Sequence, residues 1–334
     1  MFSSRKSERT GGTGVFRQSL VVVQFMLSFF LISASFIVLS QNELIKTKDL
    51  GFNREHIIMI PLRSSQLKHQ EATKLQYKNN PNVISATIAF GLPGDIVAGD
   101  GVQLPGSGKQ LLSSMFWVDQ DYISTMGMKI IAGRDFSRDF VSDSSEAFIV
   151  NESFLQTYGF PSPEESIGSR IDWEIDRSAH RFKQGKIIGV VRDFHFKSLR
   201  EKLSPAVLQI DPRNTWKLAV RISGNDVPGT IEHLRKTYEK LDPDWTFSYK
   251  FMDEGLDEMY KSEQKLGDLF TIFTYLAIFV ACLGLYGLVE YSVNQRTKEI
   301  SIRKVFGANI ASLLLLLTKR YFFLLAISCV LIVP

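Results

Sequence analysis

The sequence has 334 residues, of which 45% are hydrophobic and 22% are charged, and its formal net charge is +4. The 11 prolines and 23 glycines are too few for collagen or for a disordered low-complexity chain. The near balance of 39 basic and 35 acidic side chains gives no general attraction to nucleic acid, so no nucleic-acid partner is predicted. The apolar residues are not spread evenly but are concentrated in three runs.

The first apolar run, residues 20–39, reads LVVVQFMLSFFLISASFIVL and contains no charge. A helix needs about 20 such residues to cross a bilayer, so transmembrane helix 1 is predicted at 18–40. Residues 1–17 are rich in basic side chains, and the positive-inside rule therefore places them in the cytoplasm. The basic residues are Arg5, Lys6, Arg9 and Arg17, opposed by Glu8, while Lys46 and Lys48 on the other side weaken this orientation signal. A cleaved signal peptide is the alternative, but its apolar region is usually only about 7–15 residues long.

The second apolar run, residues 269–289, is also uncharged and predicts transmembrane helix 2 at 266–290. The segment that follows it, 291–318, is basic and is assigned to the cytoplasm. A third run begins at Tyr321 and stops after 14 residues, shorter than the roughly 20 that a span requires. Residues 319–334 are therefore predicted to be the start of transmembrane helix 3, truncated in mid-helix.

The region between the first two spans, residues 41–265, alternates β-rich runs with helical patterns, which predicts an α+β domain of one or two lobes. Strands are predicted at 56–62, 83–90, 129–133, 186–192, 206–210, 217–222 and 246–251, and helices at 66–78 and 227–241. From Asp253 onward apolar residues recur at three- and four-residue spacing without a proline, so one continuous stalk helix should enter the second span. The two cysteines, Cys282 and Cys329, both lie in apolar runs, which excludes a disulfide framework in this domain.

A search for chemistry finds no catalytic constellation. The histidines are His56, His69, His180, His195 and His233, and no pair of them has the spacing of a metal site, so no metal is predicted. His195 stands between two aromatic residues and fits either a satisfied core histidine or part of a ligand surface. The glycine-rich residues 106–109 fail as a phosphate loop because Gln110 stands where Ser or Thr should bind magnesium. No nucleotide-hydrolysis motif or cofactor is predicted, so any ATPase must belong to another chain.

The segment after the second span, residues 296–308, reads RTKEISIRKVFGA and has a short helical pattern. Ile302, Val305 and Phe306 fall on one side of it with basic residues around them, and Gly307 fits a helix C-cap. One interpretation is an amphipathic helix held by lipid headgroups. The other is a docking helix whose aromatic side chain, Phe306, enters a groove on a cytoplasmic partner.

This segment, which directly follows CLGLYGL, resembles the cytoplasmic coupling segment of MacB/FtsX-type permeases of ABC transporters. The region between the spans is similar to the periplasmic core domain of the same family in three stretches. They are GRDF at 133–136, IVNESF at 149–154 and IIGVVRDFHFKSLRE at 187–201. Members of the family place four spans around one periplasmic domain, so the chain resembles a fragment that ends inside the third span.

The resemblance implies α-helical membrane spans plus an α+β periplasmic domain, MacB-like, inserted between spans 1 and 2. A β-rich lobe would be inserted near residues 134–212 within an α/β porter-like lobe. The implied function is the permease subunit of a mechanotransmission ABC transporter, non-catalytic in itself, for export, efflux or extraction of a substrate. It would be a multi-pass protein of the bacterial inner membrane with a large periplasmic domain.

The resemblance also implies which residues couple to the ATPase and which partners are needed. The coupling residues would be Arg296, Lys298, Glu299, Ile302, Arg303, Lys304, Val305, Phe306 and Gly307. The implied partners are an ABC ATPase subunit, a second permease half, identical or not, and the lipid membrane. Whether periplasmic or outer-membrane proteins take part is left open.

Two other classes of protein are compatible with parts of the sequence. A membrane-anchored sensor has the same order of span, outer domain and span, but it would continue into a long cytoplasmic coiled coil. Here only about a dozen residues separate the coupling segment from Tyr321, which leaves no room for heptads. An enzyme on the outer face is supported only by scattered acidic residues and His195.

Overall fold

The computed structural model describes residues 10–95, 97–105, 110–176 and 181–307, and the single residues 309, 323, 326 and 328. It divides into a helical unit, Met1–Thr47 with Lys261–Pro334, and an α+β unit, Lys48–Tyr260. The predicted third span at 319–334 lies almost entirely outside the described residues, and so do Arg5, Lys6, Arg9, His180 and the glycine-rich residues 106–109.

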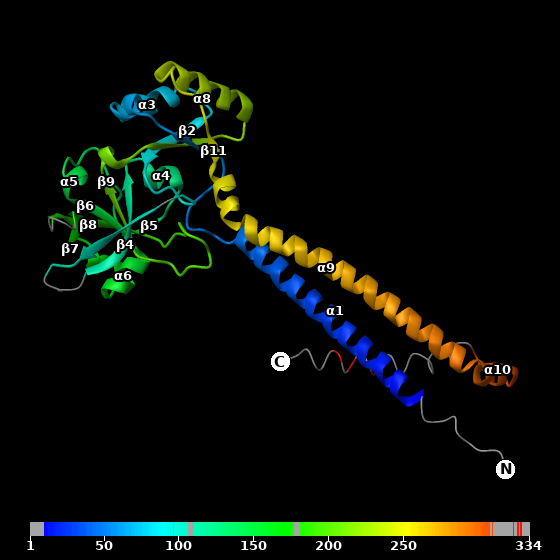
Figure 1. The fold of residues 1–334 in the computed structure, drawn as a ribbon. Helices are drawn as coiled ribbons and strands as arrows, with labels where there is room; N and C mark the ends of the chain where they lie inside the picture. The colour runs from blue at the N-terminus through cyan, green and yellow to red at the C-terminus, as the bar shows by residue number, and fades with distance from the viewer. Residues whose placement is uncertain are drawn as a thin grey trace, which may run out of the picture. The chain divides into compact units, whose positions relative to one another are not determined.

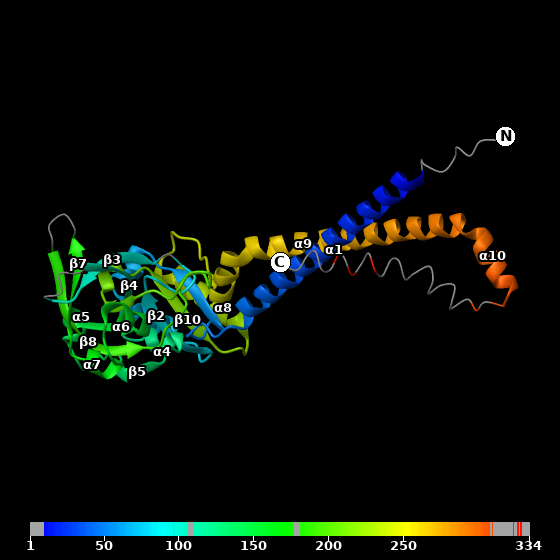
Figure 2. The same ribbon diagram turned by 90° about the horizontal axis from the view of Figure 1, so that it is seen from below.

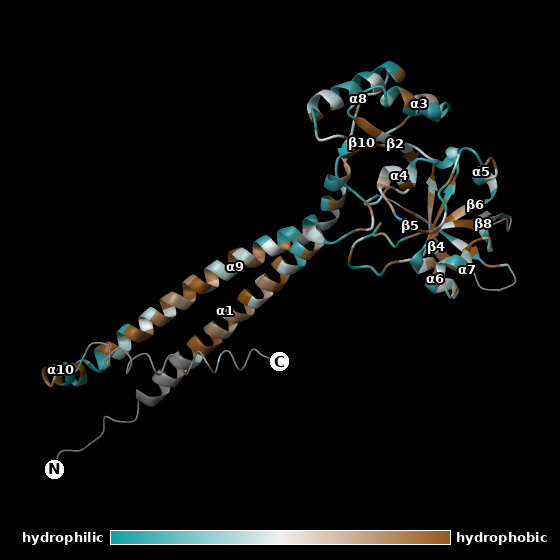
Figure 3. Ribbon diagram, turned by 180° about the vertical axis from the view of Figure 1, so that it is seen from behind, coloured by the Kyte–Doolittle hydropathy of each residue, from teal (hydrophilic) through white to brown (hydrophobic). Residues whose placement is uncertain are grey.

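The helical unit contains two long helices, α1 (Thr10–Thr47) and α9 (Met252–Gln295), of which α9 begins in the α+β unit, and a short one, α10 (Thr297–Val305) (Figure 1). Two stretches are long and apolar enough to cross a membrane, Ser19–Gln41 in α1 and Gln264–Gln295 in α9 (Figure 3). The predicted stalk helix is confirmed, because α9 is unbroken from Met252 to Gln295.

The helices α1 and α9 pack against each other through small and apolar side chains. Val21, Phe25 and Ala281 are buried in this contact. The Ser28 hydroxyl donates to the Ala277 carbonyl at 3.3 Å, and the Thr274 hydroxyl donates to the Leu31 carbonyl at 3.1 Å. In an apolar surrounding such hydrogen bonds and small residues hold helices together, since lipid offers no hydrophobic driving force.

The first sheet of the α+β unit has four antiparallel strands in the order β11-β1-β10-β2. They are β1 (Ile57–Pro61), β2 (Val83–Ala89), β10 (Lys217–Ile222) and β11 (Lys250–Phe251). The helices beside this sheet are α2 (Ser64–Leu67), α3 (Gln70–Tyr77) and α8 (Val227–Leu241). Tyr77 from α3 and Leu234 and Tyr238 from α8 are buried against the sheet, and they form its core with Ile58, Ile60 and Ile88.

The second sheet has seven strands in the order β5-β8-β6-β9-β4-β3-β7. They are β3 (Ala98–Gln103), β4 (Gln110–Val118), β5 (Ile130–Gly133), β6 (Ala147–Asn151), β7 (Arg170–Asp176), β8 (Arg181–Val191) and β9 (Ala206–Ile210). Because β7 also pairs with the first half of β8, every strand except β5 belongs to a closed ring. Phe148, Trp173 and Ile187 are buried in one core of this sheet. The remaining short helices are α4 (Tyr122–Met126), α5 (Asp143–Glu146), α6 (Glu152–Tyr158), α7 (Pro163–Ser166) and η1 (Pro212–Asn214).

A shared core joins the two sheets. The rings of Phe116, Phe194 and Phe196 meet at centroid distances of 5.0–5.4 Å, with two pairs edge to face, as aromatic quadrupoles favour, and the third pair tilted. Met252 and Leu256, from the first turns of α9, are buried in the same cluster. The beginning of α9 is therefore part of the core of the α+β unit.

The predicted secondary structure agrees in part. The predictions at 206–210, 217–222 and 227–241 are confirmed as β9, β10 and α8, whereas the predicted helix 66–78 is broken between α2 and α3, where His69 has a non-helical φ of −132° and ψ of 56°. Of the predicted strand 246–251 only Lys250–Phe251 pairs. The strands β3, β4, β6 and β7 were not predicted.

The predicted boundaries of the inserted lobe need a correction. The sequence placed the insertion near residues 134–212, but β3, β4 and β5 all belong to the second sheet. β4 pairs in parallel with β9, and β3 closes the ring against β7. The ring therefore requires β3 and β4, and β5 pairs at its edge, so the inserted lobe begins about 36 residues earlier, at β3.

A glycine at the beginning of the α+β unit generates the first testable prediction. Gly51 has φ +83°, and a Cβ there would lie 2.3 Å from the Asp193 carbonyl oxygen. We expect Gly51→Ala to destabilise the unit by about 2 kcal/mol or more, through backbone strain and this clash. Gly159→Ala is the matched control, since Gly159 has φ +77° but nothing within 4 Å. Equal losses of thermal stability for the two variants, measured on the detergent-solubilised chain, would contradict the close approach.

Candidate functional site

The predicted coupling segment begins where α9 is interrupted. Arg296 has φ −106° and ψ 13°, and its N–H is shared between the carbonyls of Ser292 and Val293 at 3.2 and 3.1 Å. The Thr297 hydroxyl donates back to the Val293 carbonyl at 3.0 Å. These hydrogen bonds give backbone carbonyls at the end of α9 their partners while the chain turns, and α10 leaves the axis of α9 (Figure 2).

The other end of α10 has the geometry that the sequence predicts. The Phe306 N–H donates to the Ile302 carbonyl at 3.1 Å, and the Gly307 N–H donates to the Lys304 carbonyl at 3.2 Å. Gly307 has φ +83°, the left-handed conformation that a residue without Cβ adopts most easily. The predicted capping role of Gly307 is confirmed, and it fixes where the helix stops after Val305.

One side of α10 presents apolar side chains to solvent. Val305 and Phe306 are each 86% exposed and Ile302 is 59% exposed. Ile302 precedes Val305 by three residues and Phe306 by four, so the three side chains are neighbours on one face of the helix. Lys298 lies one turn before Ile302 on the same face. An exposed apolar cluster on a helix of nine residues, with basic residues at its edge, is typical of an interaction surface.

Charged residues support this helix but contribute little energy. The Arg303 guanidinium lies 2.8 Å from the Glu299 carboxylate, an i,i+4 pair with both side chains nearly half exposed. Such a pair stabilises a helix by only about 0.3–0.5 kcal/mol. Glu299 in the first turn and Arg303 and Lys304 in the last turn also oppose the helix dipole favourably. All the predicted coupling residues therefore lie on α10 or at its two ends.

A second cluster of charges, in the α+β unit, was not predicted from the sequence. Lys74 on α3 is only 2% exposed, and its ammonium group lies 2.6–2.8 Å from the carboxylates of Glu71, Asp119 and Asp121. The oxygens of these acids lie within 4.8 Å of one another, a spacing that would also suit a metal ion. The ammonium group is already within hydrogen-bonding distance of all three, so an ion pair network accounts for the cluster without a metal.

The pKa values show how strongly this network is coupled. Burial acts to raise the pKa of Asp121, but hydrogen bonds from Arg138 and Lys74 outweigh it and lower the pKa to about 2. Burial likewise acts to lower the pKa of Lys74, and the surrounding carboxylates raise it instead. The Arg138 side chain extends the network by binding Asp121 at 2.7 Å and Glu71 at 3.0 Å.

Asp119 joins this network to both sheets. It follows β4 of the second sheet, and its carboxylate accepts hydrogen bonds from the Thr87 hydroxyl at 2.5 Å and the Ile88 N–H at 2.9 Å on β2. Together with Lys74 it ties the edge of the first sheet to the second. Nothing in the sequence signals this role, because the partners lie 31–45 residues apart.

His195 acts mainly through its backbone. Its N–H donates to the Leu50 carbonyl at 2.8 Å, while Phe194 and Phe196 on either side are buried in the shared core. Burial, with a smaller contribution from Lys48, lowers the pKa of its half-buried imidazole. Of the two alternatives left open by the sequence, this packing favours the structural one.

Comparison with known proteins gives a match to the coupling segment and its flanks. Residues 271–333 match the C-terminal domain of FtsX-like permeases. This part of the chain is similar to an FtsX-like permease domain. The chain is 22% identical over 299 residues to an uncharacterized ABC transporter permease, YvrN, of Bacillus subtilis strain 168, an alignment that covers 80% of this chain and 69% of that protein. The family resemblance stated from RTKEISIRKVFGA is confirmed, and permeases of this family are typically non-catalytic.

Solved structures with a similar fold are more distant. The periplasmic region of MacB from Actinobacillus actinomycetemcomitans is 13% identical with a TM-score of 0.45, covering 65% of this chain and 98% of that one. The extracellular domain of YknZ, a noncanonic ABC-type transporter from Gram-positive bacteria, is 11% identical with a TM-score of 0.41, covering 58% and 97%.

The buried Lys74 generates the second prediction. We expect Lys74→Met to destabilise the α+β unit by about 3–5 kcal/mol, because it leaves the buried Asp119 without a counter-charge. Lys236→Met on α8 is the control, because its partner Glu232 and its own side chain are both exposed. The control should cost less than about 1 kcal/mol. Thermal unfolding of the solubilised chain measures both, and a Lys74 variant as stable as the control would contradict the network.

Proposed function

We propose that this chain is the membrane-spanning subunit through which a partner ATPase moves an outer domain, in a mechanotransmission ABC transporter. The subunit itself performs no chemistry. The movement would serve export, efflux or extraction of a substrate. The observation that carries the proposal is the exposed apolar face of α10, formed by Ile302, Val305 and Phe306.

Burial of that face provides the energy for docking. Removing a Val, Ile or Phe side chain from water is worth roughly 1.5–3 kcal/mol each, and aromatic residues in a pocket are common hot spots of interfaces. Lys298 at the edge of the face would add charge complementarity to an acidic rim. A lipid surface could also receive such a helix. The α10 helix follows a break at Arg296 and is capped by Gly307, so it presents a fixed, short surface that suits a groove.

The second requirement of the proposal is a rigid connection between α10 and the α+β unit. The helix α9 has 44 residues, which corresponds to about 66 Å of continuous helix. Its first turns are built into the shared core through Met252 and Leu256. The Tyr260 hydroxyl also accepts a hydrogen bond at 2.8 Å from the N–H of Leu199, in the segment that follows β8. A displacement at the α10 end would thus be passed on as a helix movement, which a flexible linker would absorb.

The proposed topology assigns the apolar stretches of α1 and α9 to the membrane. The α+β unit would lie on the periplasmic side, with the N-terminus and α10 in the cytoplasm of a bacterium. The corresponding segments are 1–17 cytoplasmic, 18–40 span 1, 41–265 outer domain with stalk, 266–290 span 2, 291–318 coupling segment and 319–334 span 3. Only 6% of the apolar window of α9 is buried by described residues, which leaves room for further spans and a second permease half.

Affinity capture of the chain from detergent-solubilised membranes tests the docking face. We expect an ATPase to accompany the wild type and to be lost, by at least about ten-fold, from Phe306→Asp, which places a charge in the apolar contact. Thr297→Asp is the matched control, because it adds the same charge to the same helix at an exposed position on the side opposite Phe306. Retention by Phe306→Asp would contradict the docking face, and absence of an ATPase from the wild type would favour the sensor alternative.

A proline in α9 tests the rigid connection separately. Lys265→Pro removes one helical hydrogen bond and costs about 3 kcal/mol locally, whereas Lys265→Ala leaves the helix intact. We expect both variants to retain the ATPase, but only the alanine variant to transmit its movement. Spin-label distances between an exposed site on α8 and an exposed site on α1, measured with and without ATP, report movement of the α+β unit relative to the first candidate span. A proline variant that responds like the wild type would contradict a rigid stalk.

A further inference from the structure

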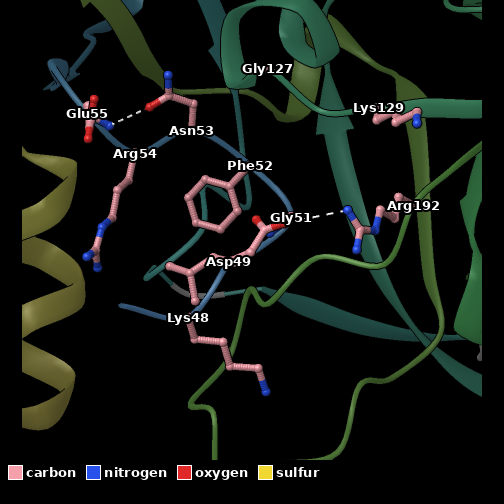
Figure 4. Close-up of a pocket in the computed structure, with 11 residues that line it drawn as sticks. Lys48, Asp49, Gly51, Phe52, Asn53, Arg54, Glu55, Gly127, Lys129 and Arg192 are labelled. Carbon is pink, nitrogen blue, oxygen red and sulfur yellow. Dashed lines mark hydrogen bonds and ion pairs between the residues drawn. The ribbon is translucent and has the colours of Figure 1, made fainter. Parts of the chain in front are cut away.

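A polar pocket opens at the start of the α+β unit, in the segment that follows α1. Its volume is about 440 Å³, and it is lined mainly by residues 48–55 together with the turn before β5 and the end of β8 (Figure 4). The charged residues that line it are Lys48, Arg54, Lys129 and Arg192, opposed by Asp49 and Glu55. The lining therefore has an excess of positive charge.

Two of the cationic residues, Lys129 and Arg192, lie on adjoining backbone segments of the lining. The Arg192 N–H donates to the Lys129 carbonyl at 2.9 Å, directly beyond the paired residues Ile130 and Val191. Residues opposite each other on antiparallel strands place their side chains on the same face, and like charges in that position repel. Asp49 approaches Arg192 at 3.5 Å, but both side chains are more than half exposed and the pair is weak.

Positive charge in the pocket is only partly compensated. In the described part of the chain, no carboxylate lies within 4 Å of the ammonium groups of Lys48 or Lys129. An anion bound in the pocket would offset part of this positive charge. An anion in this pocket would remain partly exposed, because lining side chains such as Arg192 and Asp49 are themselves more than half exposed. Such a site can be reached from solvent or from a membrane surface.

Part of the pocket lining, residues 53–55, is held in place by hydrogen bonds to its backbone. The Arg221 guanidinium donates to the carbonyls of Thr125, Glu55 and Asn53 at 2.9, 3.0 and 2.8 Å, and so fixes residues 53–55 from behind. The Asn53 N–H donates to the Met126 carbonyl at 2.8 Å. A site that is already ordered loses little conformational entropy when it binds a ligand.

One residue of the pocket lining, Lys48, follows the end of a candidate span closely in the chain. The apolar stretch of α1 ends at Gln41, and the helix continues to Thr47, immediately before Lys48. Seven residues of helical rise correspond to about 10 Å, which is within reach of the headgroup layer for a lysine side chain. The ligand available there in quantity is the phosphodiester of a phospholipid.

We propose that this pocket binds the phosphate of an anionic phospholipid headgroup on the outer leaflet, through Lys48, Lys129 and Arg192. The inference rests on the membrane placement of α1 in the proposed function. It adds a lipid-binding site to the α+β unit that does not depend on the ATPase. Phosphate is the shared chemistry of a lipid headgroup and of a free phosphate ester, and the experiment separates the two.

Lipid-dependent stabilisation of the full chain tests the site. Phosphatidylglycerol and phosphatidylcholine are added separately to the chain in detergent, and the midpoint of thermal unfolding is followed as each is titrated. We expect phosphatidylglycerol to raise the midpoint and phosphatidylcholine to raise it less. The Lys129→Gln/Arg192→Gln variant should bind phosphatidylglycerol about 25-fold more weakly, from about five-fold for each cation near an anionic surface.

The control removes an equal charge elsewhere in the α+β unit. Arg235→Gln/Lys236→Gln on α8, at exposed side chains, should respond to phosphatidylglycerol like the wild type. Equal responses of the wild type to both lipids, or an unchanged affinity of the pocket variant, would overturn the proposal. Glycerol 3-phosphate that reproduces the stabilisation at the same concentration would also overturn it, since a free phosphate would then be the ligand.

Two further measurements keep the result unambiguous. If the double variant does not fold, native mass spectrometry of the wild type with both lipids replaces it. Selective retention of phosphatidylglycerol would support the proposal, and equal retention of the two lipids would overturn it. The Phe306→Asp chain should keep the full phosphatidylglycerol response. A failure of ATPase docking and a failure of lipid binding are therefore seen in different experiments.

Discussion

The ion pair between Lys74 and Asp119 is the interaction on which the α+β unit depends as a single body. Asp119 follows a strand of the second sheet, Lys74 lies on a helix of the first, and Asp119 also binds the edge of β2. A buried ion pair gains little over apolar packing, but removal of one partner is costly. The pair contributes a fixed relation between the two sheets. The shared core of Phe116, Phe194 and Phe196 would specify that relation less strictly alone, because its apolar contacts are adaptable.

The fixed relation between the two sheets matters for α9, because the first turns of this helix pack into the core between them. Met252 and Leu256 are buried in the core that the two sheets share, so the start of the helix is anchored to both sheets and not to one alone. A movement of α9 therefore acts on the whole unit. If the lobes were loosely joined, the same movement would be taken up between them. The proposed function needs both features: contacts that hold the two sheets of the α+β unit together, and a continuous α9 that transmits movement to them.

The features that local sequence decides were predictable, and those that distant residues decide were not. The helix α10, its cap at Gly307 and the stalk follow from spacing within a few residues. β3 reads AGDGVQ and β4 contains two adjacent serines, so neither has the alternation of a strand, and both exist because ring closure pairs them with β7 and β9. The buried Lys74 belongs to the same class, because three carboxylates from two elements create its environment.

The pocket at the start of the α+β unit also accounts for a discrepancy in the charge distribution of the sequence. Under the proposed topology the positive-inside rule predicts few basic residues just after α1, yet Lys48 follows it and lines one pocket with Lys129 and Arg192. Basic residues that serve only to orient a span in the membrane need not lie together in the folded structure. Lys129 and Arg192 are instead brought together by the backbone hydrogen bond between their segments, and Arg221 holds residues 53–55 of the same lining. Under the proposed topology, binding accounts for these basic residues better than membrane orientation does, and docking accounts for those around α10.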